Sequence, residues 1–176
     1  MRTKLTVAAF CCATSALLAQ DAPKVQEPEY LGIVNVLDSS GALQPLERQR
    51  AKHQSKANVF GFIKGTTIIS GAHSPIRFPA GQPLEFVVKL DTAGYDPFLI
   101  VRLLPLAVAK NGREFVIMKT SAMGFSPRVN DTLIALNIAN YGERSYRIVP
   151  VDPLPPGEYA IESGTFTFCF GIDSAK

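Results

Sequence analysis

The chain has 176 residues, with 18 Lys and Arg against 15 Asp and Glu, and three cysteines. An export signal over residues 1–19 would remove two of the basic residues and no acid, which leaves a mature net charge of +1. A chain so evenly balanced has no long-range field that would gather nucleic acid or anionic lipid. We therefore expect no nucleic-acid partner.

The N-terminal segment has the features of a secretory signal peptide. Basic Arg2 and Lys4 precede an apolar run over residues 5–19, and polar sequence follows. This run is shorter than the roughly 20 apolar residues that a membrane-spanning helix needs. Cleavage is expected after Ala19, with cleavage after Ala16 as the alternative, and the protein is predicted to be periplasmic or secreted, with no transmembrane segment in its mature form.

Cleavage would leave Cys169 as the single cysteine, so the mature chain could form no internal disulfide. Small extracellular domains commonly depend on disulfides, and their absence here favours a bacterial source. A lone thiol in an apolar strand is typical of a small buried hydrophobic residue, and we expect this of Cys169.

Beyond the signal, residues 20–29 carry two prolines and mixed charge, which predicts a flexible lead-in. Residues 30–176 then form one domain, in which apolar runs of five to eight residues alternate with turn residues. That rhythm is typical of β-strands. The expected strands are residues 30–37, 58–63, 66–70, 84–90, 98–104, 113–119, 133–139, 145–151, 158–162 and 165–171.

Two local features are the most specific. In residues 84–90, Leu84, Phe86, Val88 and Leu90 fall on one face while Glu85 and Lys89 fall on the other, as in a half-buried strand. Asn111 and Gly112 separate two apolar runs and supply the positive φ angles of a two-residue hairpin turn.

An antiparallel set of nine or ten strands buries its apolar faces as a two-layer sandwich or as a closed barrel. The segment LPPGEYAI, residues 154–161, favours the sandwich: Gly157 turns the chain and Tyr159 opens a strand, as in the tyrosine corner of immunoglobulin-like domains. The predicted fold is a single all-β, antiparallel, immunoglobulin-like sandwich. A closed barrel is the alternative.

Three blocks of the sequence carry a resemblance. They are VNVLDSSGALQPLERQ (34–49), LPPGEYAI (154–161) and FCFGID (168–173). Together they resemble exported bacterial β-rich proteins of unassigned function. The resemblance implies export and a β fold, and no activity.

Residues that could carry catalytic or metal chemistry are few and scattered. His53 and His73 lie 20 residues apart with no cysteine near them, so no metal site and no cofactor are expected. His73 and Ser74 are neighbours in GAHSP, a spacing that seldom gives the geometry of a serine nucleophile and its base. Asp91 and Asp96 flank a loop and do not form an evident glycosidase pair.

The segment RQRAKHQSK, residues 48–56, is the one concentrated charge in the chain. A helix would place Arg48, Lys52 and Lys56 four residues apart, where like charges repel, so an extended or coiled segment is expected. Arg48, Arg50, Lys52 and Lys56 are the candidate contacts for an anionic partner, either an envelope protein or a polymer. A solvated loop, or a strand edge protected by its charge, is the favoured interpretation of the segment.

These observations favour a non-catalytic exported module that binds a protein or polymer partner. One alternative is a small exported hydrolase whose site is assembled from distant residues. Another is a protein that holds a small apolar ligand between its sheets. Convergence of His73, Asp91, Asp96 and Cys169 in one pocket would favour the enzyme, and their dispersion would favour a binding protein.

Overall fold

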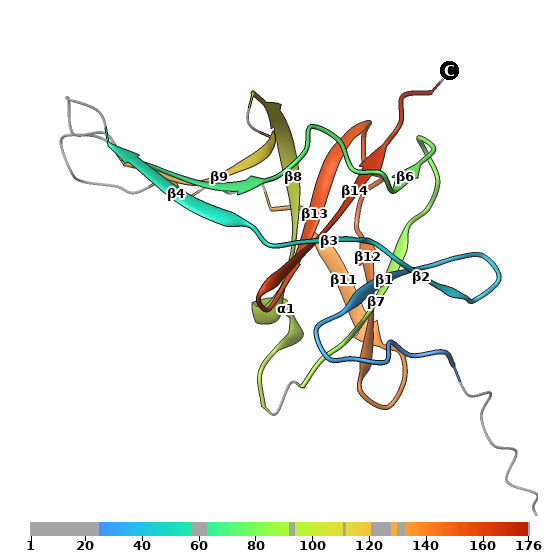
Figure 1. Cartoon of the computed structure of the whole chain (residues 1–176). Helices are drawn as coiled ribbons and strands as arrows, with labels where there is room; N and C mark the ends of the chain where they lie inside the picture. The colour runs from blue at the N-terminus through green and yellow to red at the C-terminus, as the bar shows by residue number, and fades with distance from the viewer. Residues whose placement is uncertain are drawn as a thin grey trace, which may run out of the picture.

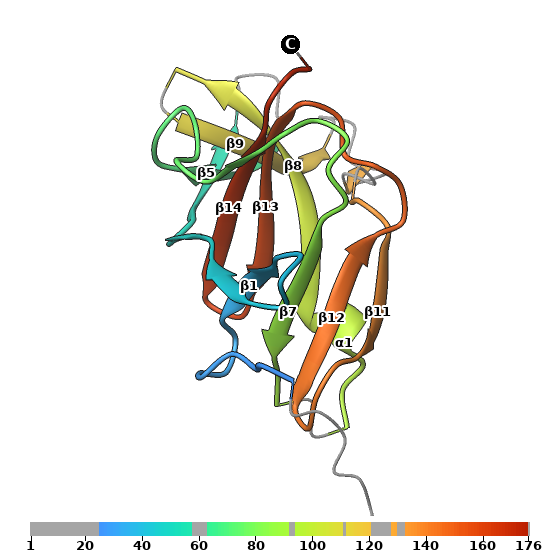
Figure 2. The same ribbon diagram turned by 90° about the vertical axis from the view of Figure 1, so that its right-hand side faces the viewer.

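The structure of the protein is a computed structural model, which describes residues 25–57, 63–91, 94–110, 112–120, 128–129 and 133–175. Strands dominate these residues and form two sheets packed face to face (Figures 1 and 2). All strand pairs but one are antiparallel among them. The all-β, two-layer prediction is confirmed. Its immunoglobulin-like topology stays a prediction.

The first sheet has five strands. In spatial order they are β11 (Leu136–Asn140), β12 (Ser145–Pro150), β7 (Glu85–Lys89), β1 (Val34–Leu37) and β2 (Leu43–Pro45).

The second sheet has nine strands. Its main path is β3 (Glu47–Gln49), β14 (Phe166–Ile172), β13 (Gly157–Ser163), β8 (Val101–Ala109), β9 (Gly112–Thr120), β5 (Ile63–Ile69) and β4 (Lys52–Ala57). Two short strands join it at the sides: β6 (Arg77–Phe78), which runs parallel to β14, and β10 (Arg128–Val129), which pairs with β9.

The second sheet is curled. β3 and β4 lie at opposite ends of its strand order, although only Arg50 and Ala51 separate them in the chain. The two ends must therefore approach one another. The described residues of β3 and β4 do not pair, so the sheet stays open and the closed-barrel alternative is not what the structure shows.

The main core lies between the two sheets. Alternate residues of β7 and β1 meet those of β13 and β14, among them Phe86, Val34, Ile161 and Phe170. Phe170 packs against the rings of Phe86 and Tyr159. The buried face predicted for residues 84–90 is confirmed, because Leu84, Phe86, Val88 and Leu90 are all buried in this core. The other face is only partly exposed, because Val87 on that face is buried as well.

A second, smaller apolar cluster lies on the inner face of the curled sheet. Its buried members are Ile69, Leu104, Leu106, Phe115, Ala160 and Cys169. Cys169 is fully buried there, as predicted, and burial raises the pKa of its thiol to about 12. The sheet thus buries both faces over much of its width.

One strand prediction is wrong at its start. Residues 98–104 were expected to be extended, but Pro97–Ile100 form a single helical turn, α1, before β8 begins at Val101. The side chain of Asp96 accepts a hydrogen bond from the backbone N–H of Phe98 at 2.9 Å, and Pro97 stands at the first helical position. Capping and proline chemistry outweigh the apolar run here.

Most other predicted strands have shifted boundaries. The first begins at Val34 because Gly32, with φ +74°, turns the chain after Tyr30 and Leu31. The strand expected over residues 58–63 lies mostly outside the described residues, and Asn111 of the predicted hairpin turn lies outside them too. Gly112 has the predicted positive φ, +132°, but it is the first residue of β9, opposite Ala109, and so does not lie within the turn. A Cβ there would lie 2.2 Å from the carbonyl oxygen of Ile69.

Tyr159 has the contacts that a tyrosine corner requires. Its ring is 3% exposed, and its hydroxyl donates a hydrogen bond to the carbonyl oxygen of Pro155 at 2.6 Å. Gly157 lies against this ring: a Cβ atom added at Gly157 would lie 3.6 Å from the ring. The corner closes the connection between β12 and β13.

The described part of the lead-in is attached to the first sheet. The carboxylate of Glu27 accepts hydrogen bonds from the hydroxyl of Ser145 at 2.6 Å and from the backbone N–H of Glu143 at 2.9 Å. Sequence analysis predicted a flexible lead-in over residues 20–29 and did not predict this contact. Within the described residues, no helix has the length and apolarity to cross a membrane.

Candidate functional site

The predicted basic segment is extended, as expected, and the fold divides it into two parts. Arg48 and Arg50 lie over the ring of Phe166, 5.0 and 5.5 Å from its centre. Lys52 and Lys56 belong to β4, an exposed edge strand that pairs with β5. The four residues therefore do not form one site: two stack on an aromatic ring and two lie on a strand edge.

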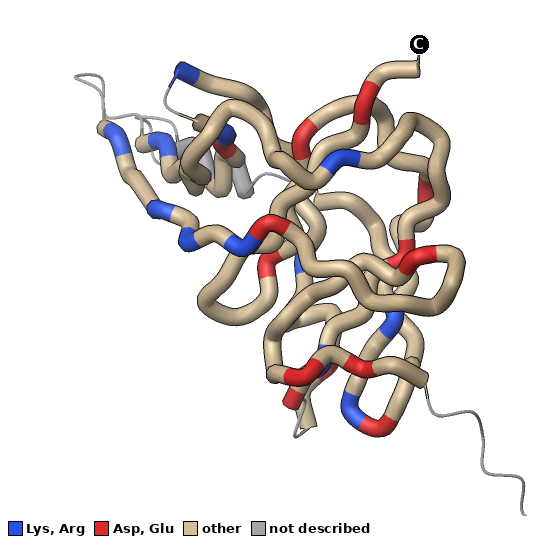
Figure 3. Tube along the Cα trace, turned by 45° about the vertical axis from the view of Figure 1, so that its right-hand side comes forward, with Lys and Arg blue, Asp and Glu red and all other residues tan. Residues whose placement is uncertain are grey.

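Lys52 and Lys56 lie beside basic residues of neighbouring strands. Sequence analysis did not group those residues with the basic segment. We call β4, β5, β9, β10 and the end of β8 that adjoins β9 the basic arm; its strands β4 and β9 project from the body of the molecule in Figure 1. A run of basic positions follows β3 and β4 toward the end of this arm in Figure 3. The arm is where cationic residues gather.

The register of the strands sets these cations in a row. Lys56 is opposite Lys64, Lys64 is opposite Lys119, and Lys119 is opposite Arg128. Lys56 and Lys64 thus lie directly opposite one another on neighbouring strands about 4.8 Å apart, and the register continues through the backbone positions of Lys119 and Arg128. Like charges directly opposite one another destabilise a sheet, so the Lys56–Lys64 pair favours an anion that would neutralise it.

A shallow hollow of about 190 Å³ lies beside this row, on the outer face of the arm. Lys56, Lys64 and Lys110 line it, with Glu114 as the one acid among its lining residues. Lys64 is 3.4 Å from Glu114, whereas Lys56 and Lys110 have no ion-pair partner in the described part of the chain. The hollow therefore keeps a net positive charge.

A second charged cluster is buried at one end of the curled sheet. Arg113 is fully buried, and its guanidinium donates to both carboxylate oxygens of Glu47, at 2.9 and 3.0 Å. Further donations go to the carbonyl oxygens of Gly71 and Ser70, and Glu158 lies 3.6 Å away. We call Arg113, Glu47 and Glu158, together with the more exposed Arg77 that pairs with Glu158, the buried charge network.

Glu158 is the carboxylate that joins this network to the loop before β6. It accepts hydrogen bonds from Arg77 at 2.6 Å, from the backbone N–H of Ser74 at 2.8 Å, and it contacts His73 at 3.2 Å. Burial alone would raise the pKa of Glu158, but these hydrogen bonds outweigh it and lower the pKa below its ordinary value of 4.5. The carboxylate of Glu158 is thus satisfied by hydrogen bonds from within the protein.

This arrangement decides the roles of His73 and Ser74. The Ser74 hydroxyl is 2% exposed and donates to the carbonyl oxygen of Cys169 at 3.2 Å, so it faces the interior. His73 contacts Glu158 rather than the Ser74 hydroxyl. The pair forms a loop anchor, and no nucleophile and base face one another there.

The remaining candidate residues are separated. Asp91 lies 3.6 Å from Arg144 at the surface, while Asp96 caps α1. His53 contacts the hydroxyl of Thr67 on the adjacent strand at 3.2 Å. In the described residues, no three His, Cys, Asp or Glu side chains are grouped so that they could hold a metal ion.

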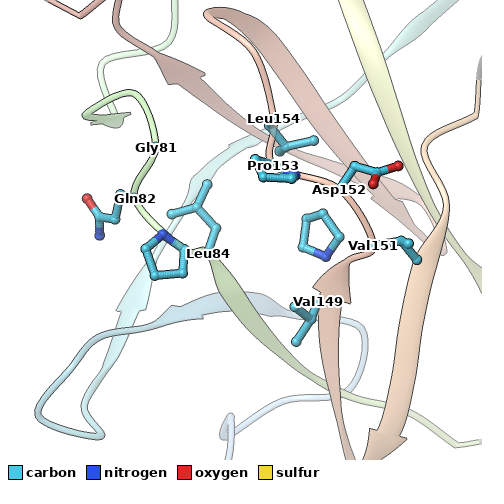
Figure 4. A pocket seen from close by; sticks show the side chains of 10 residues that line it. Gly81, Gln82, Leu84, Val149, Val151, Asp152, Pro153 and Leu154 are labelled. Atoms are coloured by element: carbon cyan, nitrogen blue, oxygen red, sulfur yellow. The ribbon is translucent and has the colours of Figure 1, made fainter.

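A proline-rich hollow lies between the loop before β7 and the connection from β12 to β13. Figure 4 shows Leu84, Val149, Pro153 and Leu154 around it, with Asp152 at one side. Its volume is about 200 Å³. Ligand sites usually span at least about 300 Å³ and combine apolar walls with several convergent polar groups. This hollow is smaller, and among its apolar walls only Gln82 and Asp152 carry polar side chains.

Comparison with known proteins found no family model, no curated protein and no solved structure that matches the chain. The resemblance to exported bacterial proteins therefore stays a prediction.

The sequence indicated only part of the basic arm. Lys64, Lys110, Lys119 and Arg128 are isolated cations in the chain, and strand register alone brings three of them into line with Lys56. Sequence analysis did not indicate that Arg113 is buried, because a single arginine in a strand pattern ordinarily faces solvent.

Proposed function

We propose that this protein is a non-catalytic exported module, periplasmic or secreted and of bacterial origin, that binds an anionic envelope protein or polymer through its basic arm. The observation that carries the proposal is the cross-strand row that begins with Lys56 and Lys64. The basic N-terminal residues and apolar run of the sequence support the exported location.

The absence of an evident catalytic constellation among the described residues supports binding over catalysis. Ser74 faces the interior, Cys169 is buried with a raised pKa, and the two aspartates of residues 91–96 have separate surface roles. A thiol with a raised pKa is a poor nucleophile at neutral pH. None of the hydrolase candidates meets the others in one pocket.

The extended geometry of the arm suits a linear anionic partner. A linear anion that crosses β4 and β5 meets Lys56 and Lys64, and Lys52 lies four residues from Lys56 along β4, on the same face. Contacts of exposed lysines are screened by salt, with a Debye length of about 8 Å at physiological ionic strength. The proposed binding should therefore weaken steeply as salt is raised.

The experiment is retention of the protein on a bacterial envelope fraction at low and high salt. The test variant is Lys56→Ser, Lys64→Ser, Lys110→Ser, which empties the hollow of cations. A matched control, Lys89→Ser, Arg144→Ser, Arg147→Ser, lowers the net charge equally on the five-stranded sheet and its turn. The proposal predicts that only the first variant loses low-salt retention. Equal retention of all three proteins would reject it.

A further inference from the structure

The end of the sandwich near α1 holds a hollow that the basic arm does not use. It lies between the ends of strands from both sheets, and its volume is about 310 Å³. Its walls are mainly apolar, and they include Leu31, Ile33, Leu90, Ile100, Ser163 and Phe166. We call it the end hollow.

Ser163 is the unusual group in this wall. Its side chain is on the face of β13 that looks between the sheets, together with Tyr159 and Ile161, and the residue is 1% exposed. Among the buried polar side chains that the structure describes, the Ser163 hydroxyl is the one without a hydrogen-bond partner. Burying a hydroxyl without a hydrogen bond costs free energy, so a group that bonds to the Ser163 hydroxyl would be stabilised here.

A lone water molecule fits this place poorly. Ordered buried waters usually make two to four hydrogen bonds to polar groups, whereas the end hollow offers mostly aliphatic and aromatic walls. An organic ligand could fill the apolar space and satisfy the hydroxyl with one polar group.

The rim of the end hollow is also apolar. Leu31 lines it and is half exposed, and the adjacent Tyr30 is 64% exposed. On the other side, Ile100 lines the hollow and the neighbouring residues Phe98 and Leu99 are 53% and 76% exposed. Large apolar side chains gathered in the open commonly mark a binding site.

The charges around the hollow restrict the class of ligand. No Lys or Arg lines it, and Asp91 is the one charged residue in its wall. A carboxylate or phosphate bound at Ser163 would lose its hydration among apolar walls that contain no cation, because Arg48 and Arg50 lie over the ring of Phe166 and Arg144 lies beside Asp91, all outside the lining. The geometry points to a small, neutral, mainly hydrocarbon ligand that carries one hydroxyl or carbonyl group, bound with that group on the Ser163 hydroxyl. This site is independent of the anion-binding function proposed for the arm.

The test uses 1-hexanol and hexanoate as probes in NMR titrations of the protein at neutral pH. Hexanol should shift the signals of residues in the walls of the end hollow, and hexanoate should bind more weakly. Ser163→Ala should weaken hexanol binding by about two- to tenfold, the effect of one hydrogen bond.

Ser145→Ala is the matched control, because Ser145 is an equally buried serine whose hydroxyl is already bonded to Glu27. It should lower the melting temperature and leave hexanol affinity unchanged, whereas Ser163→Ala should leave the melting temperature unchanged or raise it. The inference is overturned by unchanged hexanol affinity in Ser163→Ala, by equal binding of hexanoate, or by a loss of melting temperature in Ser163→Ala that matches Ser145→Ala. The last result would indicate a bound water only.

Discussion

The buried charge network and the basic arm lie on the same curled sheet, but the charges of the network are paired within the protein and those of the arm are largely unpaired. In the network, Arg113 and Arg77 meet Glu47 and Glu158, and hydrogen bonds from the protein satisfy the carboxylates. In the arm, Lys56 lies opposite Lys64, and two lysines of the hollow, Lys56 and Lys110, have no ion-pair partner among the described residues. Charges that the protein pairs internally serve folding, and charges it leaves unpaired are available to a partner.

The network should be the more costly of the two regions to disturb. Arg113→Ala would leave Glu47 in a partly buried site without its partner, and breaking a buried pair in this way typically costs about 3–5 kcal/mol. Urea unfolding measures the change. Arg102→Ala provides the contrast, because Arg102 pairs with Glu162 at 2.6 Å with half of its side chain exposed, and it should cost less than about 1 kcal/mol. Similar losses in the two variants would remove the distinction between buried and exposed pairs.

The network also predicts the direction of the pH dependence of stability. The pKa values of Glu47 and Glu158 are lowered from 4.5, because hydrogen bonds, chiefly from arginine, outweigh the effect of burial. Groups with a lowered folded-state pKa add stability above their unfolded-state pKa and lose it as pH falls through the folded-state value. The free energy of unfolding should therefore fall as pH is lowered below about 4.5.

Glu158→Gln is the variant that isolates this effect, because the amide keeps the shape of the side chain and removes the titrating group. Its stability at neutral pH should be lower than that of the wild type, and its dependence on acid pH should be shallower. Chemical denaturation at several pH values gives both quantities. An unchanged acid slope would show that Glu158 does not contribute to the loss.

A smaller effect is expected where a single neutral hydrogen bond is removed. Tyr159→Phe deletes the hydroxyl that donates to Pro155, which should cost about 1 kcal/mol because the ring still fills its site. The melting temperature and urea midpoint measure this loss. Wild-type values would count against the tyrosine corner and against the immunoglobulin-like interpretation of the sandwich.

The smallest effect on stability is expected in the arm. Replacing Lys56 and Lys64 with serine removes repulsion between opposite cations and no described pair except that with Glu114, so the unfolding free energy should change by less than about 0.5 kcal/mol. Binding of an anionic polymer should fall in the same variant. A large loss of stability would place these lysines with the network, as structural residues.

Sequence pattern predicted the strands well where alternation was strict or turn chemistry was specific. Residues 84–90 and the connection around Tyr159 are examples, because each depends on neighbours in the chain. The helical turn at Pro97 was missed because Asp96 and Pro97 outweighed an apolar run. The capping residue and the proline that begin this turn were visible in the sequence, but the apolar run was taken as the stronger indication.

The site was harder to predict than the fold, because it depends on register. Lys56 and Lys64 were visible as basic residues, but only the pairing of β4 with β5 sets them opposite one another. Glu47 and Glu158 are more than 100 residues apart and meet at Arg113 through the curl of the sheet. A pass along the chain carries no information about such contacts.

The most direct test of the central claim is to map an anion onto the protein. Dextran sulfate, a linear polyanion, would be titrated into labelled protein while NMR signals are followed residue by residue at low salt. The account predicts that signals from Lys56, Lys64 and Lys110 shift together and return as salt is added, while those of Arg113 and Glu158 stay fixed. Shifts spread evenly over all exposed cations, or centred on Arg144 and Arg147, would contradict it.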